Sequence, residues 1–309
     1  MEAVAALIAA TLSAGTPLLL AAVGLLLNER AGVLNLGAEG MMLVAAAVGF
    51  AAGFHSGSVT VALMAGAAAG VTVSMVFSLL AVGMVTNQYA TGLALTLFGA
   101  GLSAFIGLPY VGKTLLQPGS GSAWSGIPWL KDIPFAGPAF FSLHPVVYLA
   151  LLLTGAVAWF LTRTRAGLVV QAVGESPESA HAVGLPVRGI RIAAVSFGGA
   201  CCGLAGAYLS CVYTPLWVDG MVAGRGWIAL ALTTFATWRP WRVALGAYLF
   251  GSVTMIQFYL QAEGVQIASQ LLSMLPYLAT VVVLAVISRN PVFIRLNMPA
   301  SLGKPFRGG

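Results

Sequence analysis

Long apolar windows recur along this chain and restrict it to one structural class. A helix rises 1.5 Å per residue, so about 20 apolar residues cross a hydrocarbon core about 30 Å thick. We expect about nine such crossings, of which 221–238 is the least secure. The windows are 3–27, 33–54, 59–84, 88–108, 145–162, 191–212, 221–238, 241–262 and 267–288.

The composition supports a polytopic, all-α integral membrane protein. Hydrophobic residues make up 59% of the chain and charged residues only 7%, against roughly a quarter charged in soluble domains. No polar stretch is long enough to bury a separate core, so we expect one transmembrane domain over residues 1–309. The first window follows Met1-Glu2 without a positive segment, which favours a retained helix over a signal peptide.

The basic residues predict the orientation. Lysine and arginine accumulate in short cytoplasmic loops, and a cytoplasmic 163–190 loop puts eleven of them on that side and only Lys113 and Lys131 outside. This arrangement places the N-terminus outside and the C-terminus in the cytoplasm. The net charge of +6 therefore reflects topology rather than a nucleic-acid surface. The eleven are Arg30, Arg163, Arg165, Arg188, Arg191, Arg239, Arg242, Arg289, Arg295, Lys304 and Arg307.

Two loops are long. The external loop, 109–144, is rich in proline, so we expect irregular structure there. The cytoplasmic loop, 163–190, contains "ESPESAHAVG", in which Ser176 is a helix N-cap, Pro177 the first helical residue and Gly184 a stop signal. We predict a short polar helix on the cytoplasmic face.

The stretch "GLPYVGKT", 107–114, has the letters of a phosphate-binding P-loop. That motif cradles phosphate only when it follows a strand and opens a helix. Here it ends the fourth window and begins the external loop, with Pro109 in its middle. We interpret the match as accidental and expect no nucleotide site in this chain.

Small residues are dense within the windows, as in "LMAGAAAG" and "FGGACCGLAGAY". They allow helix backbones to approach closely in lipid, so we interpret them as packing sites. The three cysteines lie within one apolar window without polar partners, and neither they nor the scattered histidines predict a metal site. No catalytic set of residues is apparent, which argues against an enzyme.

Two charged residues inside apolar windows are candidate pathway residues. Asn35 and Glu39 lie in the glycine-punctuated stretch "GVLNLGAEG". Arg225 lies between Gly224 and Gly226, which indicates broken or bent backbone at membrane depth. Regular helices would leave Glu39 and Arg225 about 15 Å apart. A direct ion pair therefore requires unwound or re-entrant backbone; the alternative is a separate structural or water-facing role for each.

Further pathway candidates begin the fourth window, in "TNQYATG". Asn87, Gln88 and Thr91 either cap the helix start, which we favour, or line the inner mouth of a path. Trp227 adds an aromatic face next to Arg225. Such residues also serve packing alone in many membrane helices.

Three stretches carry a family resemblance: "NERAGVLNLGAEGMMLVAA" (28–46), "LVVQAVGESPESAHAVGLPVRGIR" (168–191) and "GRGWIALALTTFATWRP" (224–240). The chain resembles permease subunits of bacterial ATP-binding-cassette (ABC) importers in the ribose and branched-chain amino acid branch, most of all the nucleoside permeases. The resemblance implies a multi-pass subunit of the bacterial inner membrane, without its own ATPase site or cofactor, in which alternating access is driven by a partner ATPase that uses ATP–Mg.

The resemblance also implies partners and roles. It implies a second permease, like or unlike this one, a cytoplasmic ABC ATPase, and a solute-binding lipoprotein or periplasmic protein. The predicted cytoplasmic helix would be the coupling helix that contacts the ATPase, through Glu175, Ser176, Pro177, Glu178, Ser179, Ala180 and Gly184. Nucleosides are the expected solutes, followed by monosaccharides and branched-chain amino acids. An ion-coupled secondary transporter is the main alternative from another class, and a scaffold subunit is the third.

Overall fold

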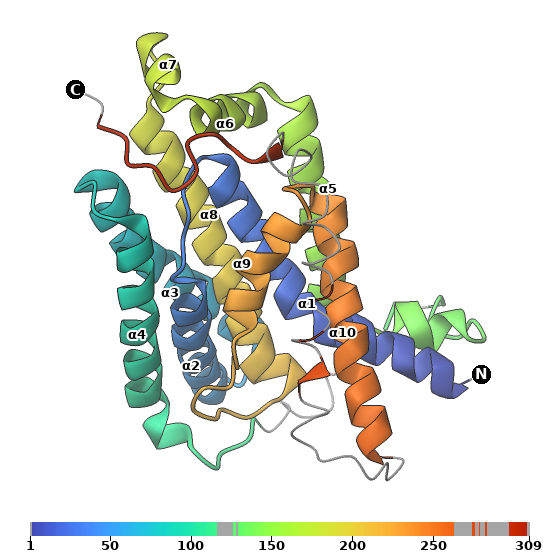
Figure 1. Ribbon diagram of the computed structural model, residues 1–309. Helices are drawn as coiled ribbons and strands as arrows, with labels where there is room; N and C mark the ends of the chain where they lie inside the picture. The colour runs from blue at the N-terminus through green and yellow to red at the C-terminus, as the bar shows by residue number, and fades with distance from the viewer. Residues whose placement is uncertain are drawn as a thin grey trace.

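The structure is a computed structural model that describes residues 2–115, 126–127, 129–262, 274–275, 278, 282 and 297–307. In this part of the chain the regular elements are helices, arranged as a tilted bundle (Figure 1). Seven of them are long and apolar enough to cross a membrane. The prediction of a polytopic helical membrane protein is confirmed. The ninth predicted window, 267–288, lies almost entirely outside the described residues.

Most helix boundaries follow the apolar windows closely. The long helices are α1 (Glu2–Arg30), α2 (Ala38–Ser56), α3 (Val59–Ser78), α4 (Gln88–Gly107), α5 (Pro145–Arg163), α8 (Val187–Tyr208) and α10 (Pro240–Ala262). Five-residue π-helical segments, Leu79–Gly83 and Leu209–Tyr213, extend α3 and α8. The short helices are α6 (Arg165–Glu175), α7 (Pro177–Ala182) and α9 (Arg225–Phe235).

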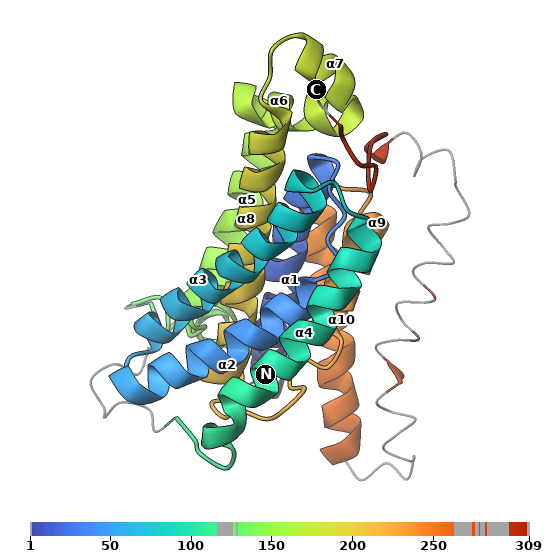
Figure 2. The ribbon, with the colours of Figure 1, turned by 90° about the vertical axis from the view of Figure 1, so that its left-hand side faces the viewer.

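Helices α1, α2 and α8 form the centre of the bundle, with α3, α4, α9 and α10 packed around them (Figure 2). Glycine makes the α3–α8 contact close: a side chain at Gly70 or Gly203 would meet the backbone of Gly199 or Gly66 on the facing helix. The predicted role of small residues in helix packing is thus confirmed. The three cysteines are buried and unbridged, as expected for packing residues.

Two of the predicted crossings are interrupted. Residues 31–37 are not helical, so α2 begins partway along the bundle instead of at its end (Figure 1). In the window 221–238 only α9 is helical, and its eleven residues span about 16 Å, too short to cross the membrane alone. Both interruptions agree with the expectation of broken helices, and 221–238 does not span as a single helix.

The two ends of the bundle are formed by different parts of the chain. Helices α6 and α7 and residues 297–307 lie together at one end, and the N-terminus lies toward the other (Figure 1). The P-loop-like stretch falls at the end of α4, where Leu108–Tyr110 form a 3₁₀ turn and Lys113 lies over the rings of Phe54 and Tyr110. It follows a helix rather than a strand, so the interpretation as an accidental match is supported.

Candidate functional site

The unwound segment 31–37 makes hydrogen bonds with a side chain of α4 and with one of its own side chains. The Gln88 side-chain oxygen accepts a bond from the Leu34 N–H at 2.8 Å, and the Asn35 oxygen accepts from the Gly37 N–H at 2.9 Å. Non-helical backbone at membrane depth is tolerated only when its polar groups are satisfied within the protein. The side chains of Asn35 and Gln88, both predicted as pathway residues, therefore stabilise this segment.

Glu39 connects the first turn of α2 with the start of α9. Its Oε1 accepts a hydrogen bond from the Gly224 N–H at 2.8 Å, and its Oε2 accepts from the Gly226 N–H at 2.6 Å. Gly224, the N-cap of α9, has no side chain to cap the helix. Because the first N–H groups of a helix lack intrahelical partners and carry partial positive charge, the carboxylate supplies the missing cap.

Glycine is required where these two helices meet. A Cβ on Gly226 would lie 2.5 Å from the backbone N and Cα of Glu39. On the other side of α2, a Cβ on Gly40 would lie 2.5 Å from the carbonyl oxygen of Leu95 in α4. The first turn of α2 is thus held between α4 and α9 at backbone contact.

The estimate of about 15 Å between Glu39 and Arg225 applied only to regular helices, and here Arg225 lies between the two residues whose N–H groups bond Glu39. Residues 31–37 and 214–224 are both non-helical, which brings the starts of α2 and α9 together. Arg225 is half-buried and its Nη1 donates to the carbonyls of Met221 and Val222 at 3.3 Å. Next to it, Trp227 is 37% exposed.

A second buried carboxylate holds the other end of α9. Glu29, near the end of α1, accepts hydrogen bonds from the Thr233 hydroxyl at 2.7 Å and from the Trp238 indole N–H at 2.5 Å. Arg30 donates to the Trp238 carbonyl at 3.0 Å. Sequence reasoning missed this role because Glu29 stands beside Arg30 at the end of a window, where an exposed charge is ordinary.

The remaining candidates in "TNQYATG" behave as local structural residues. The Asn87 side chain accepts from the N–H groups of Tyr89 and Ala90 at 2.9 and 3.1 Å, which caps α4. The hydroxyls of Thr91 and Thr86 are 2.8 Å apart. The favoured interpretation, helix capping, is confirmed for Asn87.

The predicted cytoplasmic helix is present as α7. Ser176 accepts a hydrogen bond from the Ser179 N–H at 3.3 Å, Pro177 is the first helical residue, and Gly184 has a φ of +85° just beyond the end. Pro177 and Ala180 face inward, whereas Glu178, Ser179 and Val183 are exposed. Glu175 is the last residue of α6 and not part of α7.

The C-terminal strap, residues 297–307, ties α6 and α7 to the unwound segment, and nothing in its sequence predicted this. Ser301 donates through its N–H and its hydroxyl to the Gly174 carbonyl, at 3.0 and 2.7 Å. The Gly303 N–H donates to the Gly32 carbonyl at 3.3 Å. Phe306 is buried against Val173, Ala180 and Val187.

Buried Arg191, on α8, joins the strap to the end of α1. Its guanidinium donates to the Ala31 carbonyl at 3.2 Å, to the Ser301 hydroxyl at 3.2 Å and to the Lys304 carbonyl at 3.4 Å. Sequence reasoning counted Arg191 only as a topology charge. Its 2% exposure shows that it is a core residue of this end of the bundle.

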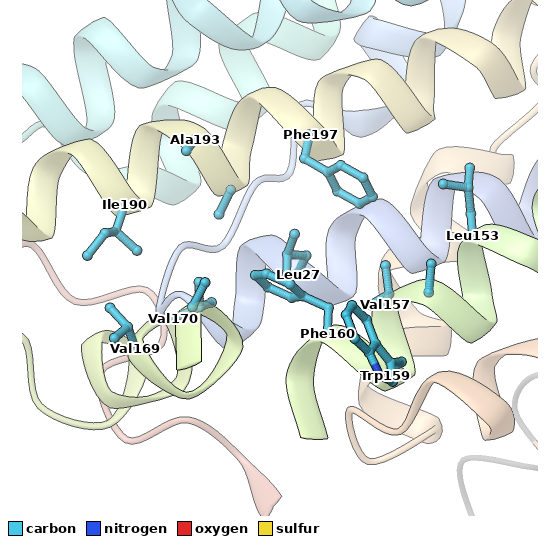
Figure 3. A pocket seen from close by; sticks show the side chains of 13 residues that line it. Leu27, Leu153, Val157, Trp159, Phe160, Val169, Val170, Ile190, Ala193 and Phe197 are labelled. Atoms are coloured by element: carbon cyan, nitrogen blue, oxygen red, sulfur yellow. The ribbon is translucent and has the colours of Figure 1, made fainter. Parts of the chain in front are cut away.

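An apolar groove of about 600 Å³ lies elsewhere, between α5, α6 and α8, with Leu27 of α1 at its floor (Figure 3). All of its lining side chains are hydrophobic, from Leu153 and Trp159 on α5 to Phe197 on α8. Apart from the indole N–H of Trp159, these side chains offer a polar solute no hydrogen-bond partner. The groove is therefore unsuited to be the transport path.

The comparisons with known proteins place the chain in a family. Residues 7–287 match the family described as the permease component of branched-chain amino acid transport systems. The chain belongs to this permease family. A putative glucose ABC transporter permease of Haloferax volcanii is 40% identical over 98% of this chain and 97% of its own length.

Two further relatives are named for nucleosides. A nucleoside ABC transporter permease of Lactococcus lactis is 29% identical over 87% of this chain and 88% of its own length. A guanosine ABC transporter permease of Bacillus subtilis is 32% identical over 79% of both chains. No solved structure matches the permease. The family match supports an ABC transporter permease over an ion-coupled transporter or a scaffold.

Proposed function

We propose that this permease is the membrane-spanning subunit of an ABC importer for nucleosides. Two relatives named for nucleoside or guanosine transport, each covering about four-fifths or more of the chain, support this choice. The 40% identity to a putative glucose permease favours monosaccharides as the second candidate. Both solute classes carry a sugar ring, and branched-chain amino acids rank third.

The junction of α2 and α9 is the part of the chain that we assign to solute passage. Glu39, Asn35 and Gln88 have bonded carboxylate or amide groups, so they shape the junction rather than bind solute. Arg225 and Trp227 have side chains that are partly exposed beside it. A cation and an aromatic face suit a solute that combines hydroxyl groups with a flat base.

A continuous set of contacts supports coupling between α7 and this junction. Phe306 packs against Ala180 of α7, Gly303 bonds to Gly32, and residues 31–37 lead directly into the α2 turn that carries Glu39. Movement of α7 by a cytoplasmic ATPase that uses ATP–Mg would thus be transmitted to α9. A second permease and an extracytoplasmic solute-binding protein complete the proposed importer in the cell membrane.

Uptake of radiolabelled solutes by cells with and without this gene tests the proposal. The panel contains nucleosides, pentoses, hexoses and branched-chain amino acids. We expect loss of nucleoside uptake in the deletion strain and its return with the gene. Loss of hexose uptake alone would establish the second candidate, and unchanged uptake of every solute would contradict the assignment.

A further inference from the structure

The apolar groove between α5, α6 and α8 contains open space of about 600 Å³ lined by the described residues. Its floor is formed by buried Leu27, Val157 and Val170, whereas Trp159 at its rim is 62% exposed. Figure 3 shows Phe197 on α8 opposite Phe160 and Trp159 on α5, and Ile190 on α8 opposite Val169 and Val170 on α6. A cavity with only apolar walls does not hold ordered water.

The groove lies within the membrane-spanning part of the fold and ends at α6. Its walls extend along α5 from Leu153 to Phe160 and along α8 from Ile190 to Phe197. These are seven residue steps on each helix, or about 10 Å. Helix α6 closes one end with Ala166, Val169 and Val170, so in the part of the chain that the structure describes a hydrocarbon chain would enter from the bilayer side.

Two arginines stand at this closed end. Arg163 is one helical turn beyond Trp159 and Phe160, on the same face of α5. Arg165 begins α6 and directly precedes the lining residue Ala166. Both arginine side chains are exposed, and the sequence contains no aspartate or glutamate from residue 133 to residue 174.

We propose that this groove binds an anionic phospholipid. One acyl chain lies in the slot between α5 and α8, and the phosphate group contacts Arg163 and Arg165. An apolar slot beneath a pair of cations at the membrane boundary complements the two parts of such a lipid. The positive-inside tendency explains arginines at this end of α5, but not their position over an open apolar slot. The proposal is independent of which solute the permease carries.

Lipid titration of the purified transporter complex, read by native mass spectrometry, tests the proposal. Phosphatidylglycerol and phosphatidylcholine with identical acyl chains are compared. We expect the wild-type complex to bind phosphatidylglycerol roughly thirtyfold more tightly, the effect of two arginines near an anionic headgroup. Arg163→Gln combined with Arg165→Gln should remove this preference. Lys304→Gln combined with Arg307→Gln, which removes two charges from the strap, should leave it intact.

A second set of variants tests the slot itself. Ala166→Trp fills the groove at its α6 end, and Ala193→Phe fills it from α8; each should weaken binding of both lipids while the unfolding temperature is retained. Equal binding of the two lipids by the wild type would overturn the proposal, as would a preference that survives loss of both arginines. Crosslinking of a cysteine at position 193 to a second permease chain would also overturn it, because the groove would then be a subunit interface.

Discussion

The carboxylate of Glu39 and the backbone N–H of Gly226, separated by 187 positions in the chain, form a 2.6 Å hydrogen bond. Through this bond and its neighbour to Gly224, the second helix of the fold provides the cap of the ninth. Neither helix could begin inside the membrane alone, since each would expose unpaired N–H groups to hydrocarbon. The position of the proposed solute site is therefore fixed by one carboxylate.

Glu39→Gln should weaken this junction. The amide retains one acceptor oxygen but turns an NH₂ group toward the second N–H, which leaves a buried donor unpaired at a cost of about 2 kcal/mol. We expect a lower unfolding temperature in detergent and reduced solute uptake. Glu178→Gln, the same change at an exposed position of α7, is the control for unfolding. Equal unfolding temperatures in the two variants would show that Glu39 does not stabilise the junction of α2 and α9.

Gly226→Ala should be more damaging than its size suggests. The new methyl group would meet the backbone N and Cα of Glu39 at 2.5 Å, and backbone atoms cannot move aside as a flexible side chain would. We expect a loss of about 3 kcal/mol or more, measured as poor yield and early thermal unfolding. Gly155→Ala in α5, where no atom lies within 4 Å, should change stability by less than about 1 kcal/mol. Similar behaviour of the two variants would contradict backbone contact at Gly226.

The long helices could be predicted from the sequence because hydropathy alone sets their positions. The window 145–162 becomes Pro145–Arg163, and the glycines beside Arg225 correctly indicated a break. The capping pattern around Ser176 likewise predicted α7, because a cap depends on neighbours within one helical turn. Local signals of this kind are contained in the sequence itself.

The unwound segment and the strap could not be predicted, because their partners are distant. Residues 31–37 contain an apolar stretch that reads as the start of a helix, and only Gln88, 54 positions beyond Leu34, satisfies the unwound backbone. Ser301 finds its partner at Gly174, 127 positions earlier. No periodicity or motif encodes such pairings, so the structural hydrogen bonds of Asn35, Glu39 and Gln88 are visible only in the folded chain.

Trp238→Phe should loosen the far end of α9. An aromatic ring remains, but the Glu29 carboxylate loses the hydrogen bond from the indole N–H. It keeps the hydrogen bond from the Thr233 hydroxyl. Hydrogen bonds to charged groups contribute about 1.5–3 kcal/mol, so we expect a loss of about 2 kcal/mol in the free energy of unfolding. Trp129→Phe, at a 90% exposed position, is the matched control and should be neutral. A neutral Trp238 variant would show that Glu29 does not depend on this bond.

Ser301→Ala should release the strap from α6. The change removes the hydroxyl that donates to Gly174 and accepts from buried Arg191, so the guanidinium loses one partner at a cost of about 1–3 kcal/mol. Limited proteolysis should cleave the strap faster than in the wild type. Ser252→Ala removes a bond to the Leu249 carbonyl within its own helix, α10, and is the control. Unchanged cleavage in the Ser301 variant would exclude the strap from the coupling route.

Val183→Glu tests whether α7 contacts the ATPase. Val183 is 76% exposed just beyond α7, and no fold contact requires an apolar side chain at so exposed a position. A carboxylate at position 183 would lose its hydration when α7 docks against an apolar surface of the ATPase, which is costly without a partner charge. We expect solute-stimulated ATPase activity of the reconstituted complex to fall at least tenfold, with unchanged unfolding of the permease. Val111 lies just beyond the C-terminal end of α4 and is 61% exposed. Val111→Glu is the control and should retain ATPase activity. Full ATPase stimulation with Val183→Glu would mean that the ATPase docks elsewhere, because a buried contact could not accept that charge.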